Sequence, residues 1–227
     1  MIHPFNERKY LVLTGDYGSG KTEIALNLAF QYAGCFQTTL VDLDIVNPYF
    51  RSGEKAEELR ERGIRVLMPT YAMTTVDIPA LPAEIQSVFD TPSEKVIFDV
   101  GGDDTGAAAL GRYYPSFLSH REETLMILTV NCMRPLTGTA EDITELAARI
   151  AARGRMPFDL IINNTNLAGE TTPEMVEAGE ETVLQCAERL GIEAVVNAVE
   201  ERLASSCRLR RPVIRITRRM KPEWMEK

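Results

Sequence analysis

The chain carries, at residues 15–22, the stretch Gly15-Asp16-Tyr17-Gly18-Ser19-Gly20-Lys21-Thr22, which fits the pattern G-x-x-x-x-G-K-[ST]. The stretch follows an apolar run at residues 10–14, which predicts a strand, and opens a helical pattern at residues 22–33. Glycines allow the backbone N–H groups to turn toward phosphate oxygens, and the helix that follows adds its positive end. Motif and context together therefore predict a phosphate-binding loop.

The rest of the sequence repeats the alternation of strand and helix. Further strands are predicted at residues 39–42, 65–68, 95–99, 124–131, 160–163 and 194–199, and helices at 54–62, 140–153 and 173–190. The strand runs are apolar throughout, as expected for strands covered on both faces. Short connections favour a mainly parallel sheet with helices on both faces, a three-layer α/β P-loop NTPase fold. At 227 residues, a single domain is expected over 1–227, with its core at about 10–199 and a basic C-terminal strand and tail at 208–227.

Composition limits the class of protein. Apolar residues make up 44% and charged residues 26% of the chain, which is ordinary for a soluble globular protein. No transmembrane segment is predicted, because a spanning helix needs about 20 consecutive apolar residues and the sequence has no such run. The N-terminus has no secretory pattern, so a cytoplasmic location is expected. The four cysteines form no close pair, which favours reduced thiols and predicts no zinc or iron–sulfur site.

Charge is distributed unevenly. The net charge is −8, yet residues 208–227 carry eight basic and two acidic residues. An acidic body argues against a broad nucleic-acid-binding surface, although the basic tail alone offers contacts for phosphate or an anionic membrane. The favoured interpretation is that residues 213–216 form a last strand surrounded by solvated arginines.

Acidic residues follow two of the predicted strands. Asp42 and Asp44 end the second strand, and Asp99 ends the fourth, where Gly101 and Gly102 follow it. A carboxylate beside the phosphate loop can hold water on Mg²⁺, and a glycine N–H can approach a terminal phosphate. Each acid alone would be interpreted as a cap or turn. Together, at parallel strand ends, they predict a site that hydrolyses a nucleotide.

These motifs resemble the CobQ/CobB/MinD/ParA nucleotide-binding domain, a family of SIMIBI-class P-loop NTPases, over about residues 10–199. The resemblance implies that Mg²⁺ and ATP bind, with Lys21 and Asp44 catalytic and Asp44 orienting the attacking water. It also implies that Thr22 binds the metal directly, and Asp42 and Asp99 through water. The nucleotide-binding residues that it implies are Gly15, Tyr17, Gly18, Ser19, Gly20, Lys21, Thr22, Gly102, Asn163 and Asn164.

One position departs from the family pattern. MinD and ParA relatives carry an early lysine in the loop that reaches the nucleotide of a second subunit, and Asp16 stands at that position here. A nucleotide-sandwich dimer of that kind is therefore not implied. Arg51 or Arg112 could substitute for this charge, but solvated surface arginine is the more common role.

The residues after the sixth predicted strand indicate which nucleotide base the site binds. Asn163, Asn164 and Asn166 occupy the place where related GTPases have Asn-Lys-x-Asp. A buried amide can both donate to and accept from adenine, whereas the two guanine donors favour a carboxylate, which Asn166 cannot replace. The sequence therefore favours ATP over GTP.

Three functions remain open. The first is an ATPase switch that acts on a protein partner or forms a homodimer through its nucleotide face, with apolar residues of a proline-punctuated loop at 69–82 available for contact. The second is an ATP-dependent ligase resembling dethiobiotin synthetase or the synthetase half of cobyrinic acid a,c-diamide synthase. The third is a GTP-driven metal-insertion helper.

Overall fold

The computed structural model describes residues 5–43, 53–68, 83–90, 93–102 and 104–220. Within them, one sheet runs in the order β3-β2-β4-β1-β5-β6-β7-β8, and every neighbouring pair is parallel. The strands are β1 (Tyr10–Thr14), β2 (Thr38–Leu43), β3 (Arg65–Leu67), β4 (Lys95–Val100), β5 (Thr124–Val130), β6 (Leu160–Asn163), β7 (Ala194–Glu200) and β8 (Val213–Ile216). The α-helices are α1 (Lys21–Ala33), α2 (Gly53–Glu61), α3 (Ala83–Gln86), α4 (Asp104–Arg112), α5 (Tyr114–Ser119), α6 (Ala140–Gly154) and α7 (Pro173–Leu190).

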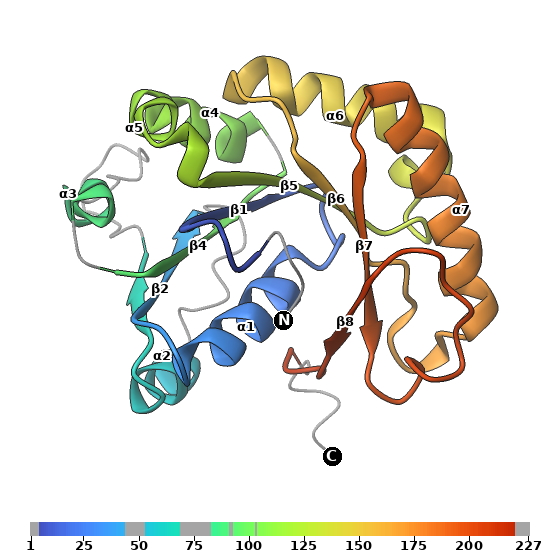
Figure 1. Ribbon diagram of the computed structural model, residues 1–227, viewed down its shortest axis with the longest axis horizontal. Coiled ribbons are helices and arrows are strands. Elements are labelled where there is room, and N and C mark those ends of the chain that lie inside the picture. Colours follow the sequence, from blue (N-terminus) through green and yellow to red (C-terminus); the bar gives the residue numbers. More distant parts are fainter. Residues whose placement is uncertain (1–4, 44–52, 69–82, 91–92, 103, 221–227) are drawn as a thin grey trace, which may run out of the picture.

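Helices cover both faces of the sheet. α1 and α2 lie on one face, and α4, α5, α6 and α7 lie on the other (Figure 1). Along β1, Leu11 and Leu13 pack in the cluster that includes α1, whereas Tyr10 and Val12 pack in the cluster on the opposite face. Apolar side chains on both faces explain why the strand sequences do not alternate with polar residues. The predicted three-layer α/β fold is confirmed.

The predicted elements are present with small shifts at their ends, including the last strand at 213–216. The sequence patterns gave no prediction of α3, α4 or α5. The short helices α4 and α5 are held by long-range packing, because Leu110, Tyr113 and Phe117 are buried against Phe89 and Phe98. Short segments such as these depend on tertiary contacts more than on their own helix propensity.

The parallel sheet gathers the predicted site at one edge. β1 lies between β4 and β5, and the chain proceeds from β1 to β2 on one side before it reaches β5 on the other. Such a switch in strand order leaves a crevice at the carboxyl ends of the strands, where open α/β sheets bind their ligands. The phosphate loop leaves β1 at this point.

The described cysteines are free thiols. Cys132, Cys186 and Cys207 are partly or fully buried, and burial raises the pKa of each thiol. Among the described residues, no group of three His, Cys, Asp or Glu side chains is placed to hold a metal ion. None of the helices in these ranges combines the length and apolar character that crossing a membrane requires.

Candidate phosphate and nucleotide site

The phosphate loop is held in a glycine-dependent conformation. Gly20 has a φ of 88° and caps the start of α1, and a Cβ atom there would lie 2.2 Å from Nδ2 of Asn164. Gly102, which follows β4, packs even more closely, because its Cβ would lie 1.7 Å from the carbonyl oxygen of Gly15. A side chain at either position would displace the loop. Gly102 therefore lies against the phosphate loop.

Lys21 is the first residue of α1 and is buried. Its Nζ donates a hydrogen bond to the carbonyl oxygen of Asp16, 3.1 Å away, so the ammonium group lies over its own loop. A buried ammonium group is costly unless it is well paired, and a backbone carbonyl satisfies only one of its three donors. The hydroxyl of Ser19 is also buried and has no hydrogen-bond partner in the described part of the chain. Both groups suit an anion bound in the loop.

Two buried carboxylates lie beside the loop. Asp42 of β2 and Asp99 of β4 occupy paired positions in neighbouring parallel strands, and each is 1% exposed. The hydroxyl of Thr22 donates to Oδ2 of Asp99 over 2.6 Å. A threonine hydroxyl and carboxylate oxygens are the ligands that Mg²⁺ prefers, directly or through its water shell. The residues present therefore fit Mg²⁺, whereas Asp44 lies outside the described residues.

The asparagines after β6 have different roles. Asn164 donates from Nδ2 to the carbonyl oxygen of Ser19 over 2.7 Å, and its Oδ1 has no hydrogen-bond partner among the described residues. Asn163 is fully buried and is bonded to Asn197 and Thr165. Asn163 therefore organises the loop from inside the protein, and Asn164 is the asparagine placed to face a ligand.

Asn166 forms local turns. Its Nδ2 donates to the carbonyl oxygen of Asn164, and its Oδ1 accepts from the N–H of Ala168. The backbone carbonyl of Asn166 also accepts from Nδ2 of Asn131, which directly follows β5, so this bond ties two neighbouring loops together. Asn166 therefore shapes the loop beside the cavity through both its side chain and its backbone.

A cavity of about 260 Å³ lies beside the phosphate loop. Gly18, Gly20, Arg134, Asn164 and Asn166 line it on the loop side, and residues of β7, β8 and the segment after β8 line the other side. Pockets for whole small ligands are typically about 300–1,000 Å³. The cavity is therefore of a size for one part of a larger ligand whose remainder lies in the phosphate loop.

Two carboxylates line this cavity, and both are already engaged. The Glu23 carboxylate accepts the backbone N–H groups of Arg219 and Met220, and burial raises its pKa while these hydrogen bonds oppose the rise. The Glu200 carboxylate lies 2.9 Å from Arg202 and 4.0 Å from Arg218. No uncommitted carboxylate therefore faces the cavity within the described lining.

Arg134 was missed by the sequence analysis. It lies in the loop after β5, where its Nε donates to the carbonyl oxygen of Gly18 over 3.1 Å. Its position, four residues beyond the end of an apolar strand, was the available signal, because parallel strands end at one edge. Arg112, considered as a substitute charge, is an exposed residue in the last turn of α4, and Arg51 lies outside the described residues.

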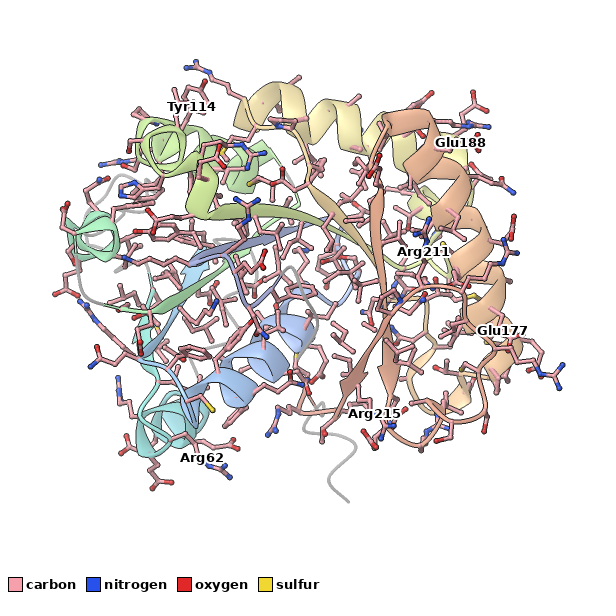
Figure 2. All side chains as sticks on the ribbon, in the orientation of Figure 1. Arg62, Tyr114, Glu177, Glu188, Arg211 and Arg215 are labelled. Carbon is pink, nitrogen blue, oxygen red and sulfur yellow. The ribbon has the colours of Figure 1, made fainter. Side chains whose placement is uncertain are left out.

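The basic C-terminal region forms part of the fold. Arg215 of β8 pairs with Glu201 over 2.7 Å, and the backbone N–H of Arg211 donates to Glu180 of α7. Figure 2 shows Arg211 beside α7 and Arg215 on β8. Acidic partners thus offset part of the positive charge in residues 208–220, in agreement with the interpretation as a last strand.

The parallel sheet and the glycine-rich loop after β1 define an α/β fold of the P-loop NTPase type. Structures with this fold include the signal recognition particle 54 kDa protein from Aeropyrum pernix K1 in complex with GDP, with a TM-score of 0.54 and 21% identity over 84% of this chain and 42% of that chain. FtsY from Mycoplasma mycoides has a TM-score of 0.52 and 18% identity over 84% of this chain and 60% of that one. The present chain therefore spans less than two thirds of either protein.

A nucleotide-binding protein from Archaeoglobus fulgidus, in complex with ADP, aligns with a TM-score of 0.48 and 14% identity over 84% of this chain and 81% of that chain. No protein-family model matches the chain, and no curated protein matches its sequence. The likeness to the signal recognition particle protein and to FtsY from Mycoplasma mycoides shows the fold.

Proposed function

We propose that this protein binds Mg²⁺-ATP and hydrolyses it, and that the bound nucleotide acts as a switch for a protein partner, as the resemblance to CobQ/CobB/MinD/ParA domains implies. The observation that carries the proposal is the contact between Thr22 and Asp99, 2.6 Å long, next to Asp42 and the lysine of the phosphate loop. This set combines a phosphate cradle with oxygen ligands for a metal.

The residues divide the work of binding and reaction. Lys21 exchanges its bond to the Asp16 carbonyl for oxygens of the β- and γ-phosphates, while Thr22, Asp42 and Asp99 hold Mg²⁺. When bound, Mg²⁺ neutralises charge that develops on the phosphates. Asp44 orients a water molecule that attacks the γ-phosphorus, the bond from phosphorus to the β–γ bridging oxygen breaks, and ADP and phosphate leave.

The cavity is proposed to hold the base, and its chemistry favours adenine. The free Oδ1 of Asn164 can accept a hydrogen bond from the adenine amino group. Guanine presents two adjacent donors that call for a free carboxylate, but Glu23 and Glu200 are engaged by other groups. Asn166, at the position of the missing acid, is bonded within its own turn.

Calorimetric titration with Mg²⁺-ATP and Mg²⁺-GTP tests the choice of base. ATP is expected to bind at least about tenfold more tightly, a difference of about 1.4 kcal/mol. Equal or tighter binding of GTP would refute the adenine assignment. ATP turnover without any added metabolite is expected for a switch, whereas turnover that strictly requires a metabolite would favour the ligase alternative.

A further inference from the structure

The segment after the last strand forms one wall of the cavity beside the phosphate loop. Ile216 of β8, Arg218 and Met220 line it, and Glu23 of α1 lies where this wall meets the helix. β8 lies next to α1 (Figure 1). Residues 217–220 form neither helix nor strand, so something other than regular secondary structure must hold this wall in place.

Side chains of α1 hold the segment by its backbone. Oε1 and Oε2 of Glu23 accept the N–H groups of Arg219 and Met220, over 2.8 and 2.9 Å. One turn further along the helix, Asn27 accepts the N–H of Thr217 over 2.9 Å and donates to the carbonyl oxygen of Thr217 over 3.0 Å. Four hydrogen bonds thus join α1 to a segment almost two hundred residues away in sequence.

An aromatic contact completes the attachment. The guanidinium group of Arg219 lies 3.9 Å from the centre of the Phe30 ring, which is a cation–π contact. Phe30 belongs to α1, the same helix that carries Glu23 and Asn27. Glu23 directly follows Thr22, so the helix that presents the phosphate loop also carries the residues that fix the wall. An acidic residue in the first turn of a helix commonly stabilises its own helix end. Here both carboxylate oxygens bind the C-terminal segment.

We propose that residues 217–220 form a strap that closes the base subsite of a purine nucleoside triphosphate, with Glu23 and Asn27 as positioning residues. The inference rests on the proposed function, which assigns the cavity to the base. Because the strap contacts the base side of the ligand, it contributes to the affinity for ATP. It does not contribute to the affinity for inorganic tripolyphosphate, which occupies the phosphate loop alone.

The first test compares these two ligands. Glu23→Gln replaces one acceptor oxygen with an amide donor that cannot accept an N–H, and Asn27→Ala removes both bonds to Thr217. Each is expected to weaken Mg²⁺-ATP binding roughly tenfold and to change Mg²⁺-tripolyphosphate binding less than about twofold. Glu141→Gln, which alters an exposed first-turn acid of α6, is the matched control and should change neither.

The outcomes separate the two proposals. Wild-type protein that binds neither ligand would overturn the proposed function. Wild-type protein that binds both, with variants that bind ATP as tightly as wild type, would overturn only the strap. Equal weakening for both ligands would also overturn the strap, because it would show damage to the phosphate loop.

Limited trypsin digestion of the wild-type chain supplies a second readout that needs no variant. Trypsin can cut after Arg218 and Arg219, whereas Lys221 is followed by Pro222 and resists cleavage. Mg²⁺-ATP is expected to slow cleavage at the two arginines several-fold, and Mg²⁺-tripolyphosphate is expected to leave it unchanged. Equal protection by both ligands, or none by ATP, contradicts the proposal.

Discussion

At the scale of single residues, the phosphate loop is contacted by more positively charged side chains than its sequence motif contains. Lys21 belongs to the motif, but Arg134 arrives from the loop after β5 and binds the outer side of the phosphate loop at the Gly18 carbonyl. Asn164 binds the next carbonyl, that of Ser19. When carbonyl groups are held from outside, the N–H groups between them are oriented toward the inside of the loop, where phosphate binds.

Arg134→Ala is therefore expected to weaken Mg²⁺-ATP binding by roughly two- to tenfold, because an exposed hydrogen bond of this kind is worth about 0.5–1.5 kcal/mol. Arg134→Lys keeps the charge but loses the planar guanidinium group, and should recover only part of the affinity. Calorimetry measures both. Arg112→Ala, in the last turn of α4, is the control, and a loss of affinity there as large as that of Arg134→Ala would contradict this assignment.

At the scale of elements, the contact between the end of β4 and the phosphate loop has no spare room. A Cβ at Gly102 would overlap the Gly15 carbonyl oxygen. Because one atom is a Cβ and the other a backbone oxygen, no change of side-chain rotamer can separate them. Gly34, which follows α1, has no atom within 4 Å of its own Cβ position and a φ of −75°, so alanine fits there without strain.

Gly102→Ala is expected to lower the free energy of unfolding by about 1–3 kcal/mol through overpacking and to weaken ATP binding. Thermal unfolding and nucleotide titration measure the two effects. Gly34→Ala should be neutral or slightly stabilising in the same assays, because it restricts the unfolded chain without a native clash. A Gly102→Ala variant that matches Gly34→Ala would show that the loop and the β4 end are less tightly packed than the structure indicates.

At the scale of the whole molecule, the proposed switch requires distant segments to respond to the γ-phosphate. Residues 42–51 include the end of β2, residues 101–106 come directly after β4, and residues 69–82 come after β3 in the sequence. Residues 44–52, 69–82 and 103 lie outside the described part of the chain. A terminal phosphate with Mg²⁺ can order segments of this kind, and hydrolysis can release them.

A non-hydrolysable ATP analogue is expected to slow hydrogen exchange in residues 42–51 and 101–106 and to alter exchange in 69–82. Amide exchange followed by mass spectrometry measures this, with α6 (Ala140–Gly154) as the internal reference that should not change. If the nucleotide binds but the amide exchange rates of all three segments stay unchanged, the switch has no mechanism and the ligase becomes the better proposal.

Local sequence patterns determined the frame of this protein. The apolar run before Gly15, the glycine-rich loop and the helix after it predicted a strand, a phosphate loop and a helix without reference to the remaining chain. The strand spacing predicted a parallel three-layer sheet, and strand-end acids were placed at one edge. The predictions of the strands, the helices and the parallel sheet succeeded because backbone sterics and hydrophobic periodicity act over a few residues.

Only the tertiary structure decided which polar side chains face the cavity. The sequence treats Asn163 and Asn164 alike, yet one is buried in a network with Asn197 and the other binds the phosphate loop. It also gives no sign that Glu23 binds residues 219–220, or that Arg134 reaches Gly18. These contacts join segments distant in sequence, and their formation depends on the register and packing of the whole sheet, which no local pattern encodes.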